Sequence, residues 1–433
     1  MPKLAPKTTT SVAKKPLKTA KILAQKALPA QPKELTKEDV KAARQYIKDF
    51  WLKLERSHVK DDESLIGLPN KYLVPAFEEH HSFDFNEMYY WDSYFMAQGL
   101  LDQEHKDLVL GMLDNLIAMF ERFKVIPNAS RTYLMGRSQP PFLTSFIRDC
   151  YETYNLDLDW LTPRMAVAER EYFTVWKGTK KPHERLVYAG LSRYYDINYL
   201  HDLAEAESGW DMTPRFSRKA LNYLPVDLNA LLYKYETDFA WAAALRGDTA
   251  ASTKWQLMAD SRADSMTNLM WDGFRGLYYD YNYVRGKRSG VASLAAYYPL
   301  WSGQASAEQA ATLVKSLKRF DEKGGLATTD QDPLGKFVLG SMPTQWAHPN
   351  GWAPLVFLTV QGLERYGYHA EARRQALKWL RTNLDWFNTH GVFLEKYNVV
   401  SPDKPPAKGV YPSQTGFGWT NAVFERFCKD YID

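Results

Sequence analysis

The chain has 433 residues, 45% of them hydrophobic and 14% aromatic, so it can bury one large core or two ordinary ones, and disorder of the whole chain is excluded. Eight lysines and no other charged residue stand within residues 1–33, so the net charge of +4 becomes about −4 for the remainder, which gives no basic face for a nucleic-acid partner. Cys150 and Cys428 are far apart and predict neither a disulfide framework nor a thiolate metal site, which fits a reducing compartment.

Residues 1–33 are rich in Lys, Ala, Pro and Thr and lack the continuous apolar stretch that a secretory signal needs. We expect a disordered tail here, and an organelle-targeting role for it stays open. No run of 18 apolar residues occurs in the chain, so no membrane span is expected. These features favour a cytoplasmic protein.

Folded structure is predicted to begin at Thr36, where Thr-x-x-Asp precedes apolar residues at helical spacing as far as Leu54. No Pro/Gly/Ser-rich linker follows, so residues 34–433 are expected to form a single, mostly α-helical domain. Spacing alone does not choose among a solenoid, a globin-like pile and a closed double ring of helix pairs. Further helices are predicted at about 92–104, 106–123, 143–155, 161–177, 228–246, 250–271, 306–319, 352–366, 369–387 and 419–431, and strands only near 276–283 and 391–397.

Five segments, taken in chain order, combine aromatic rings with carboxylates, amides and Arg. A sugar presents hydroxyl groups at its edges and one apolar face, so its site needs polar side chains for the edges and rings for the face. The composition of these segments therefore favours a carbohydrate site. They are 85–94, 126–131 with 137–141, 207–215, 345–352, and 395–398 with 414–421.

The same segments resemble the motifs of the trehalases, the inverting α,α-trehalose hydrolases of glycoside hydrolase family thirty-seven. The resemblance runs from residue 72 to residue 425. The motif Phe-x-Glu-x-Tyr-x-Trp-Asp-x-Tyr stands in register at 85–94, and Pro-Asn-x-x-Arg and Arg-Ser-Gln-Pro-Pro stand at 127–131 and 137–141. Glu-Ser-Gly-Trp-Asp follows at 207–211, Gln-Trp-x-x-Pro-Asn-Gly-Trp-Ala-Pro at 345–354, and Glu-Lys-Tyr-Asn and Gly-Phe-Gly-Trp-Thr-Asn at 395–398 and 416–421.

This resemblance implies an all-α (α/α)6 barrel, in which two rings of six helices surround a bowl formed by the connecting loops. It implies that Asp211 is the general acid and Glu395 the general base of an inverting hydrolysis, without a cofactor. The implied substrate is a disaccharide or another small α-glucoside. The sugar contacts implied by position are Phe85, Trp91, Asp92, Asn128, Arg137, Ser138, Gln139 and Gly209.

The chain departs from the family pattern where the resemblance implies the leaving-group side and the covering loop. His81 to Asp84 replace Pro-Gly-Gly-Arg, the Arg-Pro-Glu-Ser segment is missing before Glu207, Pro402 to Lys408 replace a glycine run, and Ala347 and Val410 replace acidic residues. Despite these departures, trehalose is the substrate that we expect first. A glycosidase for a different α-glucoside and a catalytically silent carbohydrate-binding protein stay open.

No metal site is predicted, because none of the nine histidines stands at a ligand spacing. Asp330 to Gly335 begins like a calcium loop, but Ser341 stands where such a loop needs Glu. We expect a turn there.

Overall fold

The computed structural model describes residues 32, 34–77, 85–178, 184–331, 344–407, 409 and 413–433. The predicted tail lies outside these residues except for Pro32, and so do His81 to Asp84, Val410 and most of the calcium-like segment. The residues from 32 to 433 belong to one unit, so every element below is part of the same body.

The first helix, α1 (Lys37–Leu54), begins where the sequence predicts. The hydroxyl of Thr36 accepts a hydrogen bond from the backbone N–H of Asp39 at 3.3 Å, and the Asp39 carboxylate accepts one from the backbone N–H of Thr36 at 2.8 Å. This reciprocal capping satisfies two N–H groups that the first turn would leave unpaired. The helix buries the apolar face that the spacing indicates, made of Val40, Ala43, Ile47, Phe50, Trp51 and Leu54.

The other predicted helices are confirmed within a few residues of their expected ends, except that the helix predicted at 161–177 ends as an α-helix at Glu171 and continues as a π-helix over Tyr172–Trp176. They are α2 (Tyr90–Leu100), α3 (Lys106–Phe123), α4 (Leu143–Tyr154), α5 (Leu158–Glu171), α7 (Val226–Leu245), α8 (Thr249–Met270), α10 (Ala307–Ser316), α11 (Ala353–Arg365), α12 (His369–His390) and α13 (Gly418–Tyr431). Two further helices, α6 (His201–Glu207) and α9 (Tyr298–Ser302), are too short for a repeated apolar face to reveal them in the sequence.

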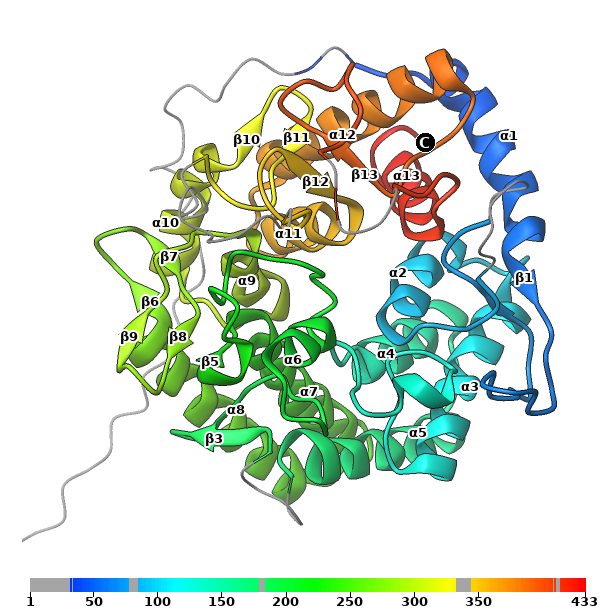
Figure 1. Ribbon diagram of the computed structural model, residues 1–433. Coiled ribbons are helices and arrows are strands. Elements are labelled where there is room, and N and C mark those ends of the chain that lie inside the picture. The colour runs from blue at the N-terminus through cyan, green and yellow to red at the C-terminus, as the bar shows by residue number, and fades with distance from the viewer. Residues whose placement is uncertain are drawn as a thin grey trace, which may run out of the picture. The chain divides into compact units, whose positions relative to one another are not determined.

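Twelve of the described helices alternate along the chain between an outer and an inner ring (Figure 1). The outer helices are α1, α3, α5, α8, α10 and α12, and the inner ones are α2, α4, α7, α9, α11 and α13. Each inner helix contacts the next from α4 through α7, α9, α11 and α13 to α2. Tyr94 of α2 then closes the ring, because its side chain stacks at 4.5 Å on Phe142, the residue before α4. The (α/α)6 barrel is therefore confirmed.

Short strands occupy the connections between helices. Two of them, β12 and β13, matter for the site because they pair antiparallel and place Trp352 opposite Lys396. The segment predicted at 276–283 contains β7 and β8, and β13 overlaps only the end of the segment predicted at 391–397. In chain order the strands are β1 (Glu55–Arg56), β2 (Tyr72–Leu73), β3 (Leu186–Tyr188), β4 (Leu191–Ser192), β5 (Tyr223–Leu224), β6 (Trp271–Asp272), β7 (Leu277–Tyr278), β8 (Tyr281–Asn282), β9 (Lys287–Arg288), β10 (Asp321–Glu322), β11 (Gly325–Leu326), β12 (Asn350–Trp352) and β13 (Lys396–Asn398).

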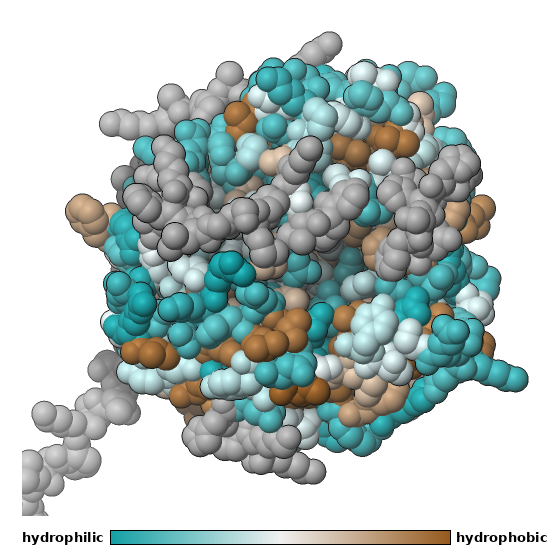
Figure 2. Space-filling view, viewed as in Figure 1, coloured by the Kyte–Doolittle hydropathy of each residue, from teal (hydrophilic) through white to brown (hydrophobic). Residues whose placement is uncertain are grey.

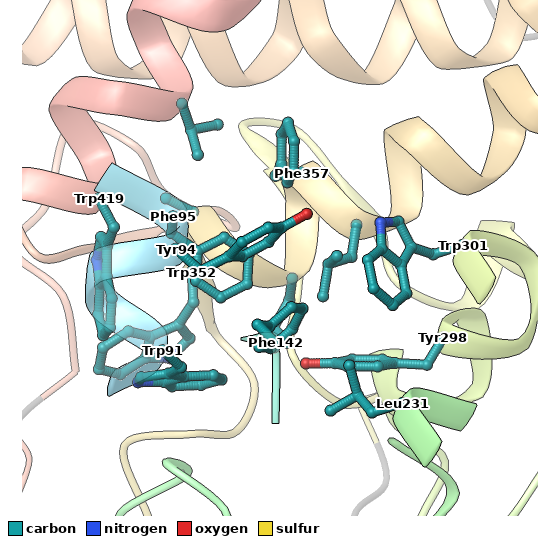
Figure 3. Close-up of a cluster of buried hydrophobic side chains, with 14 of the residues drawn as sticks. Trp91, Tyr94, Phe95, Phe142, Leu231, Tyr298, Trp301, Trp352, Phe357 and Trp419 are labelled. Atoms are coloured by element: carbon teal, nitrogen blue, oxygen red, sulfur yellow. The ribbon is translucent and has the colours of Figure 1, made fainter. Parts of the chain in front are cut away.

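Aromatic rings fill the interior of the inner ring. Figure 3 shows Trp91, Phe95 and Trp419 on one side of this cluster and Trp301 on the other, with Phe142 between them. On the face of the molecule seen in Figure 2, hydrophobic residues lie in small groups among hydrophilic ones. None of the described helices combines the length and the apolar character needed to cross a membrane.

Candidate active site

A cavity of about 310 Å³ lies where the inner helices begin, with Trp91 and Asp92 at the start of α2 and Trp419 at the start of α13. This volume is near the lower end of the roughly 300–1,000 Å³ range of small-molecule sites. Eight of the ten residues predicted from the sequence line it: Phe85, Trp91, Asp92, Asn128, Gln139, Gly209, Asp211 and Glu395. The other lining residues are Pro75, Tyr89, Trp346, Gln414, Phe417 and Trp419.

A buried ion-pair network holds the loop that carries Asp211. The guanidinium of Arg215 donates to both oxygens of Asp227 at 2.8 and 2.7 Å and to both oxygens of Asp280 at 3.0 and 2.8 Å. It also lies 4.2 Å from the ring of Trp210. Because a buried Arg needs several such partners, this network fixes the loop to α7 and to the β7–β8 connection.

The Asp211 carboxyl is surrounded by little that would stabilise its negative charge. Burial raises its pKa to about 7, the positive charge of Arg137 lowers it, and the negative charge of Glu395 raises it further. Its Oδ1 atom is buried and has no hydrogen-bond partner among the described residues. A carboxyl group in this setting is protonated for much of the time at neutral pH and can donate that proton.

Asp92 is a third carboxyl group in the same cavity. Burial raises its pKa to about 8, and the charges of Glu395 and Asp211 act in the same direction, while a hydrogen bond with Gln139 opposes them. Gln139 is itself held in place, because its Oε1 atom accepts a hydrogen bond from the backbone N–H of Trp91 at 3.0 Å.

Glu395 is 2% exposed and has a different environment. The ammonium group of Lys396 donates to its Oε2 atom at 2.7 Å. Its backbone N–H donates to the Gln414 carbonyl at 3.0 Å, and its backbone carbonyl accepts from the Trp419 indole at 3.2 Å. Contact with a cation favours the ionised form of a carboxyl group, so Glu395 can accept a proton.

Tryptophan rings form one wall of the cavity. Trp346 stacks on Trp352 at 3.7 Å with an interplanar angle of 4° and on Trp210 at 5.6 Å and 25°. Trp91 lies 5.8 Å from Trp346. At Gly209, φ is +73° and a Cβ atom would lie 2.5 Å from the ring of Trp91, so no larger residue fits without displacing that ring.

Arg137 and Ser138 do not line the cavity. Arg137 donates to Asp196 at 3.2 Å and acts on Asp211 through its charge. The hydroxyl of Ser138 donates to the Ile126 carbonyl at 2.7 Å, and its backbone N–H donates to the Glu207 carboxylate at 2.8 Å. Both residues are therefore engaged with partners outside the cavity lining.

Six lining residues are additional to the predicted set, and five of them had a sequence signal. Tyr89 lies within the first motif segment, Trp346 within 345–352, and Gln414, Phe417 and Trp419 within 414–421. Pro75 lies outside all five segments and had none.

The described residues contain no group of three or more His, Cys, Asp or Glu side chains arranged to hold a metal ion. Cys150 and Cys428 are both buried and unpaired with each other. What the cavity offers is acid/base chemistry: a buried carboxyl group suited to donating a proton, one suited to accepting a proton, and rings and amides that suit a polyhydroxylated ligand.

Comparison with known proteins gives consistent matches. A family model described as Trehalase matches residues 6–199 and 187–431. The cytosolic neutral trehalase of Kluyveromyces lactis is 32% identical over 91% of this chain and 61% of its own length, and the periplasmic trehalase of Salmonella newport is 31% identical over 88% and 72%. The chain spans about three fifths of the length of the fungal relatives that it matches.

Solved structures give the same picture. The neutral trehalase from Saccharomyces cerevisiae superposes with a TM-score of 0.72 and 28% identity, over 92% of this chain and 80% of that one. A GH63 mannosylglycerate hydrolase from Thermus thermophilus superposes with a TM-score of 0.65 and 18% identity, over 89% and 99%. The second likeness concerns the fold alone.

Proposed function

The chain belongs to the trehalase family, and on that premise we propose that it is a glycoside hydrolase that converts α,α-trehalose into two molecules of glucose. The observation that carries the proposal is the pairing of Asp211 with Glu395 in one cavity. Asp211 has a raised pKa of about 7, whereas Glu395 is in contact with a cation. A carboxyl group that tends to keep its proton can act as the acid, and one that tends to stay ionised can act as the base of the same reaction.

The mechanism that we propose is a single displacement. Asp211 protonates the glycosidic oxygen while the bond from that oxygen to the anomeric carbon breaks. Glu395 takes a proton from a water molecule, whose oxygen bonds to the same carbon from the opposite face. Asp211 is left ionised and Glu395 protonated, and exchange with solvent restores both. One glucose is released as the β anomer and the other as the α anomer.

The remaining lining residues have the chemistry to bind a sugar. The side-chain amides of Asn128, Gln139 and Gln414 can donate to and accept from hydroxyl groups, and Phe85 and Tyr89 offer rings for an apolar sugar face. The Phe85 and Tyr89 rings lie 6.1 Å apart at 72°, so they present one face and one edge.

A glycosidase for a different α-glucoside is the second candidate, because two features of the chain differ from what the family resemblance implies. Arg137, implied by the family resemblance to contact sugar, is bound to Asp196 and lies outside the cavity lining. Ala347 stands where the family has an acidic residue. These two features support an α-glucoside with a different leaving group as the second candidate. The retention of both Asp211 and Glu395 speaks against a silent binding protein.

The test of the proposed function is the rate of glucose release from trehalose by purified protein and by two variants. Asp211→Asn and Glu395→Gln should each lower kcat by at least about 10²-fold, because each removes one proton-transfer group. Asp149→Asn is the matched control. Asp149 is also a buried carboxyl with a raised pKa, but it accepts from Gln98 at 2.9 Å and lines a different pocket. Equal losses in all three variants would contradict the assignment.

We also propose a cytosolic location, which the names of the cytosolic neutral trehalases support. A periplasmic trehalase is among the relatives as well. Fractionation of the source cells decides between these compartments.

A further inference from the structure

Lys396 is a buried lysine directly beside the proposed base. It begins β13, has no measurable exposure, and donates through Nζ to Oε2 of Glu395 at 2.7 Å. A buried ammonium group is costly unless it is paired and hydrogen-bonded. The Glu395 carboxylate supplies this pairing and hydrogen bond, so each charge stabilises the other.

The strand register fixes the lysine from its other side. Trp352 of β12 is the cross-strand neighbour of Lys396, and the ammonium lies 4.9 Å from the centre of its ring. Trp352 is itself held, because its indole N–H donates to the Gln345 carbonyl at 3.2 Å and its ring stacks on Trp346. The ammonium is therefore clamped between an aromatic face and a carboxylate.

The acidic residues that line the cavity differ in whether a cation contacts them. Of the described residues that line it, three are acidic and none is cationic. Lys396 contacts Glu395 directly, whereas Asp211 has no ion pair among the described residues and is influenced by Arg137 only at longer range. Three neighbouring carboxyl groups cannot all be ionised at low cost, so the position of the cation selects which one is.

We propose that Lys396 is a positioning residue that decides which carboxyl group of the cavity acts as the base. By holding an ammonium group against Oε2, it keeps Glu395 ionised and oriented while Asp211 retains its proton. This inference rests on the proposed function. It adds a residue that does not line the cavity and that acts through Glu395.

The experiment is the pH dependence of kcat/KM for Lys396→Met, Lys396→Arg and the wild-type protein. A contacting opposite charge favours the ionised form of a carboxyl by about 1–3 pH units. We therefore expect the acidic limb of the profile to move up by at least one pH unit in Lys396→Met and to stay near its wild-type position in Lys396→Arg. At a pH below the acidic limbs of both proteins, kcat/KM of Lys396→Met should be at least about tenfold lower than that of the wild-type protein.

Lys234→Met is the matched control, because Lys234 is also buried and also bound to a carboxylate, that of Asp238, away from the cavity. It should lose stability without moving either limb. The proposal is overturned if Lys396→Met keeps the wild-type acidic limb, or if Lys234→Met moves it equally. If Lys396→Met does not fold, Lys396→Gln takes its place, since it keeps a donor and removes the charge.

A measurement that does not require turnover separates this inference from the proposed function. The infrared carboxylic-acid band of Glu395, identified by its loss in Glu395→Gln, reports the pH at which that group takes up a proton. A wild-type protein that hydrolyses no glucoside would sink the proposed function. The band would still decide the role of Lys396: it should develop at a higher pH in Lys396→Met, and an unchanged pH would overturn the proposal.

Discussion

Replacing Gly209 by alanine tests how tightly the loop of Asp211 fits against the cavity wall. The added Cβ atom would lie 2.5 Å from Cζ2 and 2.7 Å from Cε2 of Trp91, and the backbone has a φ of +73°. A left-handed conformation costs a residue with a side chain about 1–2 kcal/mol. Overpacking of a well-packed interior costs a further 1–3 kcal/mol, roughly. We therefore expect Gly209→Ala to lower the free energy of unfolding by about 2–5 kcal/mol.

Gly247→Ala is the matched control for this change. Gly247 has nearly the same φ, +75°, but nothing lies within 4 Å of the added Cβ atom. This variant should lose only the conformational part, about 1–2 kcal/mol. The difference between the two variants then measures the contact with Trp91.

The assays are urea unfolding followed by tryptophan fluorescence and steady-state hydrolysis of trehalose. Because a shift of about 1 Å in a catalytic group can cost roughly 10²-fold in rate, Gly209→Ala should also lose most of its activity, and Gly247→Ala should retain it. If the two variants lost equal free energy and kept equal activity, the close approach of Gly209 to Trp91 would be refuted.

Three further predictions concern charge. Because the pKa of Asp211 is raised to about 7 and the acid must be protonated, kcat/KM should fall as the pH rises through about 7, and a profile that stays flat to pH 9 would contradict its role. Asp196→Asn removes the negative charge that is paired with Arg137, so Arg137 should lower the pKa of Asp211 more strongly and this alkaline limb should move to lower pH. A limb that moves to higher pH would contradict the influence of Arg137 on Asp211. Arg215→Met leaves the carboxylates of Asp227 and Asp280 buried without their cation, and chemical denaturation should show a loss of about 3–5 kcal/mol.

The sequence predicts the helices well where local signals exist. The capping pair of Thr36 and Asp39 gives the start of α1, and the ends of α3 coincide with the prediction. The start of α2 lies two residues before its predicted position, since the side chain of Tyr89 makes no capping hydrogen bond that would mark it. Closure of the helices into a double ring depends on contacts between distant helices, such as that of α2 with α13, and apolar spacing alone does not contain them.

The site, too, has features that the sequence predicts and features that depend on contacts between distant residues. The motif segments predict which loops meet, and Asp211 and Glu395 do line one cavity. Their electrostatic difference depends on burial and on the register of β12 with β13, which places Trp352 against Lys396. Neither the burial nor the strand register follows from motif spacing. The role of Lys396 beside Glu395 could therefore be inferred only from the structure.

We propose that Asp211 and Glu395 hydrolyse trehalose with inversion at one anomeric carbon. The most direct test is a proton NMR time course of the purified protein with α,α-trehalose, recorded before the glucose anomers equilibrate. This mechanism predicts equal early amounts of α- and β-glucose. Early release of α-glucose alone, or no release of glucose, would contradict it.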